Sequence, residues 1–106
     1  MSVGIIAGNI ASITVLTATV DLGSVAANTS EEETATVSGV KLGDVVVCVD
    51  SSLNAGQVVA QARVSAADTV TLQVINTTAG AIDAASKTMT FLVVRPEPAS
   101  VTRVLT

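Results

Sequence analysis

The segment Thr69–Ile75 alternates between polar and apolar residues through Val74, and this period of two constrains the fold more than any other feature of the chain. In an extended strand, successive side chains point to opposite faces, so the apolar residues share one face and the polar residues share the other. Turn-forming residues recur roughly every eight to twelve positions elsewhere, a spacing typical of β-sandwiches and barrels. The pattern predicts an all-β protein.

The same signals predict strands at Ile13–Leu22, Glu33–Val37, Val45–Val49, Val58–Val64, Thr69–Ile75 and Thr88–Val94. We expect about seven or eight strands in a single antiparallel β-sandwich, either jelly-roll-like or immunoglobulin-like. Val45–Val49 is an apolar run bounded by turn residues, which indicates a central strand covered on both faces. The segments 23–30, 50–56 and 76–86 are predicted loops, the last with one helical turn at Ile82–Ala85.

The predicted core comes from the inward faces of two alternating strands: Val70, Leu72, Val74, Met89, Phe91 and Val93. A further strand is expected to place four residues on one face: Val58, Ala60, Ala62 and Val64. Pro96 and Pro98 end the last strand, because proline cannot donate to a β-ladder. We therefore expect a sandwich core at residues 12–95, between an N-terminal arm at 1–11 and a C-terminal arm at 96–106.

The side-chain chemistry of the chain argues against an enzyme. It has no His, Tyr or Trp, and Phe91 is its only aromatic residue. Its many Ser and Thr residues therefore lack an imidazole base, and Cys48 is expected to act as a small buried hydrophobe. Oxygen ligands in the segment 50–54 lack the spacing of a calcium loop and favour a turn. We predict no catalytic, cofactor-binding or metal site, and no cofactor.

The charge pattern argues against a nucleic-acid partner, and the polar residues of the uncharged N-terminal segment argue against a membrane. The net charge is −4, and the five basic residues are spread singly, whereas a phosphate-binding surface needs them clustered. The uncharged segment Val3–Val20 is interrupted by Gly, Asn, Ser and Thr, which favours an arm and a strand over a membrane or signal segment. The acidic run Glu31–Glu33 is interpreted as a solvated loop or strand entry. We predict no nucleic-acid partner and no membrane.

The two arms are the expected contact sites. Charged residues make up 13% of the chain, about half of the ~25% typical of soluble domains, so we expect oligomerisation or docking. Apolar residues in terminal segments are more stable when another surface covers them. The candidate interface residues are Val3, Ile5, Ile6, Ile10, Val101, Val104 and Leu105. The alternative is that the arms are ordinary edge strands of the same domain.

Three segments carry a resemblance to a known group of proteins: Val37–Val47, Ala62–Val70 and Val74–Asp83, the last leading into the strand that ends at Phe91–Arg95. Over residues 13–95 the chain resembles small β-rich proteins of tailed bacteriophages, some of which are head decoration or cement proteins. The resemblance implies a compact β-sandwich on an assembled capsid shell, often as a trimer. It implies no enzyme activity.

The expected function is therefore that of a non-enzymatic virion structural protein that decorates or cements a bacteriophage capsid. The expected partners are the major capsid protein and further copies of this chain, with a trimer favoured by the resemblance alone. The protein would be made in the host cytoplasm and would end on the capsid surface. The alternatives are a binding module, either adhesin-like or host-surface-binding, and a head-fibre or tail component.

Overall fold

The computed structural model describes residues 10–50 and 53–97, and these residues form eight β-strands and no helix. The strands are β1 (Ile10–Val20), β2 (Gly23–Val25), β3 (Thr29–Thr36), β4 (Val45–Asp50), β5 (Gln57–Ala66), β6 (Thr69–Asn76), β7 (Ile82–Ala84) and β8 (Lys87–Pro96). Every paired strand runs antiparallel to its neighbour. The prediction of an all-β, antiparallel protein is confirmed.

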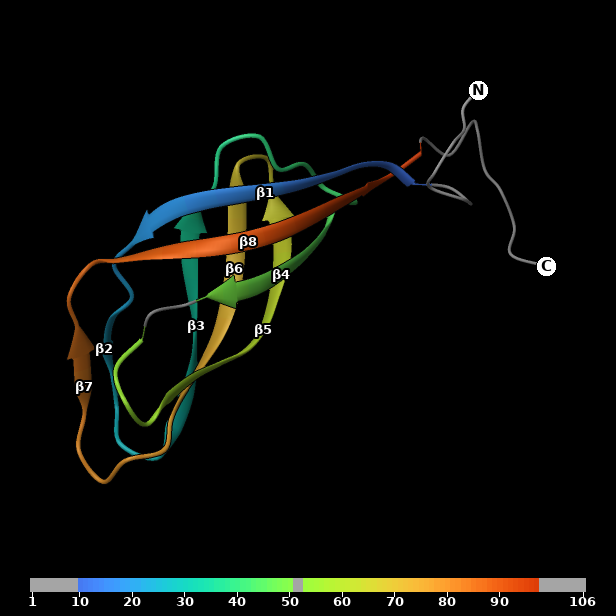
Figure 1. The fold of residues 1–106 in the computed structure, drawn as a ribbon. Coiled ribbons are helices and arrows are strands. Elements are labelled where there is room, and N and C mark those ends of the chain that lie inside the picture. The colour runs from blue at the N-terminus through green and yellow to red at the C-terminus, as the bar shows by residue number, and fades with distance from the viewer. Residues whose placement is uncertain (1–9, 51–52, 98–106) are drawn as a thin grey trace.

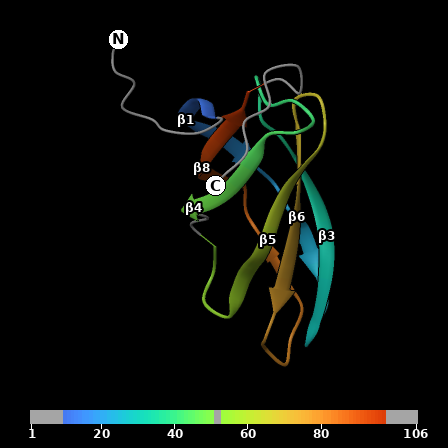
Figure 2. The same cartoon turned by 90° about the vertical axis from the view of Figure 1, so that its right-hand side faces the viewer.

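Two three-stranded sheets form the layers of the sandwich, with the strand orders β1–β8–β4 and β3–β6–β5. The strands of one sheet cross those of the other steeply (Figure 1), and the view turned by 90° separates the two layers (Figure 2). β2 and β7 form a short two-stranded ladder at one end. There the chain passes between the sheets, from β1 to β3 and from β6 to β8.

The strand pairing is nested along the chain: β1 pairs with β8, β2 with β7, and β3 with β6. This is the pairing of one long hairpin whose two halves bend together from one sheet into the other. Of the two expected topologies, the nesting is closer to a jelly roll, which is built from such a folded hairpin. β4 and β5 then complete the two sheets at their remaining edges.

The core lies between β6 and β8, the middle strands of the two sheets. All six predicted core residues are buried, with exposed fractions between 0 and 4%: Val70, Leu72, Val74, Met89, Phe91 and Val93. Seven more apolar residues complete this cluster: Val20, Leu22, Val25, Ala35, Val37, Val40 and Val46. The alternation that predicted the two strands therefore also identified the centre of the packing.

The prediction that Val45–Val49 is a central strand covered on both faces is wrong. β4 is an edge strand of its sheet. Val46 is buried against the core, but Val45, Val47 and Val49 are 50–56% exposed. An apolar run shows that both faces of a strand are apolar, and it does not show that the same chain covers both.

The prediction that Val58, Ala60, Ala62 and Val64 share one face is also wrong, because a β-bulge interrupts β5. The register with β6 shifts between Val59 and Gln61, so Ala60 is an extra residue on β5. An extra residue reverses which positions face inward. Accordingly Val58 is 49% exposed, whereas Val59, Ala62 and Val64 pack against the core.

Two predicted loops contain strands that the local sequence does not reveal. Segment 23–30 includes β2 and the start of β3, and segment 76–86 includes β7. The helical turn expected at Ile82–Ala85 is therefore wrong. β2 and β7 exist because they pair with each other across the chain, with Gly23 opposite Ala84. Such a pairing leaves no local pattern.

The ends of the described chain bear on the predicted arms. β1 begins at Ile10 rather than at Ile13, and Ile10 lies opposite Pro96, where β8 ends. The end of the last strand at the first proline agrees with the sequence. The other candidate interface residues lie outside the described residues: Val3, Ile5, Ile6, Val101, Val104 and Leu105.

Candidate functional site

The outer face of the β1–β8–β4 sheet carries two rows of branched aliphatic side chains. The register aligns one residue of each strand in each row. The first row is Ile13, Val94 and Val45. The second row is Val15, Leu92 and Val47. These six residues are called the apolar face below.

The apolar face points outward because the neighbouring positions of the same strands face the core. Val46, Phe91 and Val93 are buried, so the alternation of a strand places Val45, Val47, Leu92 and Val94 on the opposite side. β4 and β8 are thus apolar on both faces. Strands with two apolar faces are typical of sheets that are covered on both sides.

The apolar face remains substantially exposed in the described structure. Its four residues on the edge strands are 50–64% exposed: Ile13, Val15, Val45 and Val47. Leu42, in the turn before β4, and Val49, at the far end of β4, are also exposed, at 70% and 56%. A contiguous exposed apolar patch on a folded domain marks a site of association.

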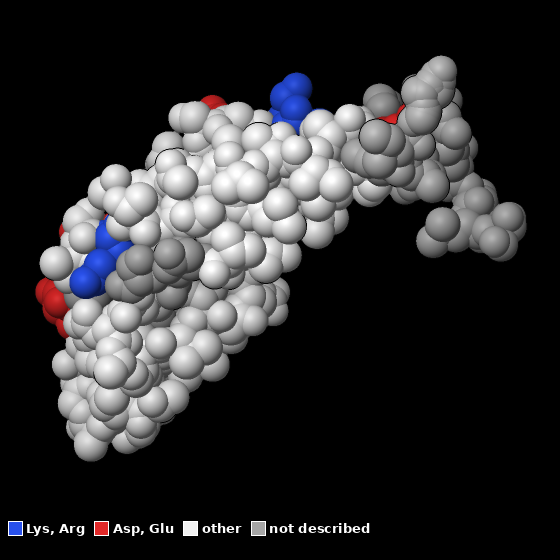
Figure 3. All heavy atoms as spheres, in the orientation of Figure 1, with Lys and Arg blue, Asp and Glu red and all other residues white. Residues whose placement is uncertain are grey.

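Charged side chains are absent from both rows of the apolar face. Figure 3 views the molecule from the side of β1, β8 and β4. A broad band over these strands shows no Lys, Arg, Asp or Glu, and the charged groups lie at its margins. Charge is depleted at the centres of protein interfaces, because burying it is costly.

The outer face of the β3–β6–β5 sheet is polar by contrast. Arg63 of β5 reaches across β6 to Glu32 of β3, with 2.8 Å between Nη1 and Oε2. Beside them, the Thr71 hydroxyl donates to the Ser65 hydroxyl at 2.7 Å. Both members of the ion pair are about half exposed, so the pair contributes little to stability. The outer face of the β1–β8–β4 sheet is therefore apolar, whereas that of the β3–β6–β5 sheet is polar and suited to contact with water.

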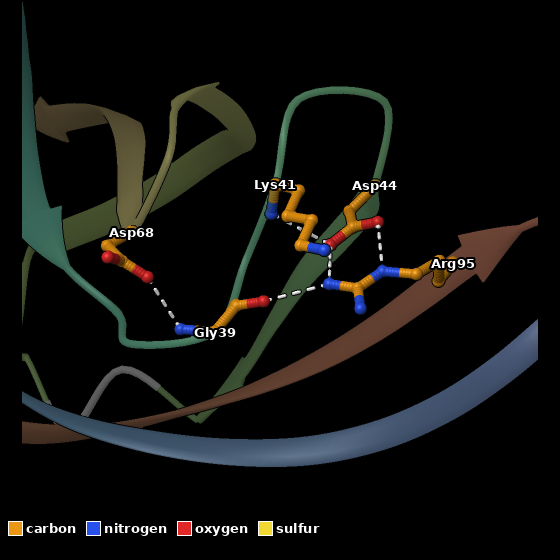
Figure 4. Close-up of polar contacts among 5 residues, drawn as sticks. All are labelled: Gly39, Lys41, Asp44, Asp68 and Arg95. Carbon is orange, nitrogen blue, oxygen red and sulfur yellow. Dashed lines mark hydrogen bonds and ion pairs between the residues drawn. The ribbon is translucent and has the colours of Figure 1, made fainter.

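A polar network fixes the turn that leads from β3 into β4, at one end of the apolar face (Figure 4). Arg95 donates from Nε to Oδ1 of Asp44 at 2.9 Å and from Nη2 to Oδ2 at 2.8 Å, and its Nη2 also donates to the Gly39 carbonyl. The backbone N–H of Lys41 donates to Oδ2 of Asp44. On the other side of the turn, the N–H of Gly39 donates to the carboxylate of Asp68.

This network has an electrostatic and a geometric consequence. The hydrogen bonds from Arg95 hold the pKa of the Asp44 carboxyl below its ordinary value, although burial acts in the opposite direction. Gly39 and Gly43 adopt φ values of +103° and +97°, which other residues rarely tolerate. The fixed turn presents Leu42 beside a shallow hollow of about 350 Å³ that Pro96 also lines. The hollow adjoins the first row of the apolar face.

The arrangement is suited to packing rather than to a reaction. The side chains of the apolar face offer no nucleophile, acid, base or ligand atom. Within residues 10–50 and 53–97, no three His, Cys, Asp or Glu side chains gather as a metal site would require. The same residues contain no helix of the length and apolar character that crossing a membrane would need. Cys48 lies half-buried in β4 and packs against the core.

The apolar face was not among the interface residues expected from the sequence. Of that set the structure describes Ile10 alone, at the start of β1. A signal for the face was nevertheless present. Val45–Val49 and Phe91–Val94 are apolar at consecutive positions, whereas strands of an antiparallel sandwich ordinarily alternate. Two such strands in one sheet indicate an outer face that needs a cover.

Comparisons with known proteins identify no relative: no family model, no curated protein and no solved structure matches the chain.

Proposed function

We propose that this protein is a non-enzymatic structural component that joins a larger assembly through its apolar face. The observation that carries the proposal is the uncharged double row of aliphatic side chains on one outer face, opposite a polar outer face. A domain with this asymmetry gains from being covered on one side and solvated on the other. A protein that lies on the surface of a shell meets both conditions.

The expected setting is the surface of a bacteriophage capsid, where the protein would decorate or cement the shell. The resemblance of residues 13–95 to phage head decoration proteins supports this setting. In it, the apolar face contacts an uncharged surface of the major capsid protein, and the polar face with Glu32 and Arg63 looks outward. The resemblance also supports a homo-oligomer, with three copies expected at each site.

The strength of one such contact favours a repeated arrangement. Burying a large aliphatic side chain completely contributes about 1.5–3 kcal/mol, so a half-exposed one contributes about 1 kcal/mol. The four edge-strand residues of the apolar face would then give on the order of 4 kcal/mol before the entropic cost of association, which is of at least similar size. A single copy would bind weakly, and several linked copies would bind tightly through avidity.

The test is co-sedimentation of the full chain with empty shells of the major capsid protein of its particle. Val47→Glu places a charge on the β4 side of the apolar face, and Thr34→Glu places the same charge on an exposed position of the polar face. We expect Val47→Glu to lose binding and Thr34→Glu to keep it, with both circular dichroism spectra unchanged. Failure of the unmodified chain to bind, or equal binding by both variants, would overturn the proposal.

A further inference from the structure

Among the strands of residues 10–50 and 53–97, β1 has an open outer edge. β1 pairs with β8 along one side, and no other strand of the described residues pairs with its opposite side. The N–H and C=O groups along a free strand edge form a template for another strand. Soluble β-proteins usually protect such edges with charges, bulges, short strands or prolines.

The other three edge strands of the two main sheets carry such protection. β3 contains the acidic run Glu31–Glu33. β5 is interrupted by bulges at Ala60 and Ser65 and carries Arg63. β4 is only six residues long, and its register shifts at Val49. Each of these features makes regular pairing with a further strand unfavourable.

β1 differs from all three. It is eleven residues long, and it contains no charged residue and no proline. Its one register shift lies at its first residues, between Ile10 and Ser12, which leaves Ser12–Val20 in regular register with β8. The strand is rich in Ile, Val and Thr, residues that form favourable cross-strand pairs. A long, regular and uncharged edge of this kind is suited to accept another strand.

We propose that the strand added to β1 is the β1 of a second copy, in antiparallel orientation. An antiparallel pair of identical strands is related by a two-fold axis, so the same edge serves both copies. Because β1 has no charge, no register places like charges opposite each other. The product is a six-stranded sheet, β4–β8–β1–β1–β8–β4, on which the two apolar faces form one continuous surface. The pairing is a property of the isolated protein and does not require a shell.

The decisive experiment measures the mass of the full chain and the amide hydrogen exchange of β1 over a wide range of protein concentration. In antiparallel pairing, alternate residues direct their N–H groups toward one neighbour, so about half of the β1 amides point away from β8. We expect a dimer at high concentration, together with slowed exchange at every second amide of β1. Both signals should disappear on dilution.

Charge variants distinguish the edge of β1 from the apolar face. Val15 and Val47 both belong to the apolar face, but Val15 lies in the middle of β1, whereas Val47 lies on β4 at the opposite edge of the same sheet. We expect Val15→Glu and Val15→Lys to be monomeric alone and to form a mixed dimer when combined. Val47→Glu should keep the dimer while losing shell binding, so the two proposals can fail separately.

Three results would overturn the inference. The first is a wild-type protein that stays monomeric at every concentration tested. The second is a dimer without alternating protection in β1, which would assign the contact to the apolar face or to the arms. The third is a dimer that Val47→Glu abolishes, which would show that the two copies stack by their apolar faces. A trimer without β1 protection falls under the second result.

Discussion

Arg95 and Asp44 form a bidentate ion pair that joins the end of β8 to the entrance of β4, 51 residues apart in sequence. The Asp44 side chain is 3% exposed and that of Arg95 is 37% exposed, so the carboxylate is buried and the guanidinium reaches solvent. The same carboxylate accepts the backbone N–H of Lys41. The pair therefore orders the turn that starts β4 and, with it, one end of the apolar face.

The first prediction concerns the loss of this carboxylate. Asp44→Asn keeps the shape of the side chain but weakens three hydrogen bonds at a buried site. We expect the free energy of unfolding at pH 7 to fall by about 1–3 kcal/mol, measured by urea denaturation. Asp83→Asn, at an exposed position of β7, is the matched control and should change little.

The same pair predicts the pH dependence of stability. The pKa of Asp44 is lower in the folded protein than its ordinary value of 3.8, so folding favours the charged form. This contribution is complete above about pH 3.8 and is lost as the pH falls through the folded pKa. The deficit of Asp44→Asn should therefore shrink in acid. A deficit independent of pH would show that the charge of Asp44 does not stabilise the fold.

The second prediction concerns Glu33, whose replacement should stabilise the protein, in contrast to that of Asp44. Burial, and then the charge of Glu31, raise the pKa of Glu33 above its ordinary value of 4.5. The charged form of Glu33 therefore destabilises the folded state at neutral pH. Glu33→Gln should raise the melting temperature at pH 7, and the gain should vanish below about pH 4.5.

Glu32→Gln is the control for Glu33→Gln because it changes the adjacent residue in the opposite electrostatic setting. Its hydrogen bond and charge interaction with Arg63 lower the pKa of Glu32. This variant should give no gain in melting temperature at neutral pH. Equal gains from both variants would indicate a general effect of net charge rather than the burial of Glu33.

The third prediction concerns Phe91, which is fully buried on the middle strand of its sheet. Phe91→Ala removes the largest side chain of the core and leaves a cavity. We expect a loss of about 3–5 kcal/mol in the free energy of unfolding, measured by denaturant titration. Leu42→Ala, at a 70% exposed position, should leave stability nearly unchanged. An unchanged unfolding curve for Phe91→Ala would contradict the packing described for the sandwich.

The sequence was sufficient for the class of fold and for the centre of the core. The alternation in Thr69–Ile75 and Thr88–Val94 depends only on which face of a strand is buried, so it predicts inward residues without a knowledge of topology. The sequence could not predict the bulge at Ala60, because an inserted residue is defined by its partner strand. For the same reason the ladder that joins β2 to β7, with Gly23 opposite Ala84, left no local sign.

The candidate site was predictable only in part. The apolar run at Val45–Val49 predicts a strand that the same chain covers on both faces, whereas the structure leaves Val45, Val47 and Val49 exposed. Whether a second apolar face meets this chain or another one depends on strand order, which no local pattern contains. The Asp44–Arg95 pair is equally non-local. The low content of charged residues does predict that the chain associates with another surface. It does not predict where on the protein that contact lies.

The fourth prediction follows from a buried amide. Gln57, at the start of β5, is 8% exposed, and neither polar atom of its side chain has a hydrogen-bond partner within the described structure. Leaving such a group unpaired is costly. Gln57→Met has a similar shape and should raise the free energy of unfolding by about 1 kcal/mol. Gln61→Met, at an exposed position of the same strand, should give no gain. Destabilisation by Gln57→Met would show that the amide is paired in solution.

The fifth prediction compares the arms with the apolar face. The arms carry Ile5, Ile6, Val101 and Val104, and we expect them to add to the shell contact. Because β1 begins at Ile10, the N-terminal truncation should remove residues 2–9 and leave that strand intact. The C-terminal truncation should remove residues 99–106.

Each truncated protein is expected to keep the melting curve of the full chain, because both truncations retain every residue of the described core cluster, from Val20 to Val93. Each should also bind shells more weakly than the full chain, in the same co-sedimentation assay as Val47→Glu. The comparison separates two contributions, since Val47→Glu leaves the arms unchanged and the truncations leave the apolar face unchanged. If both truncated proteins bind as well as the full chain while Val47→Glu does not bind, the arms contribute nothing and the contact lies on the sheet.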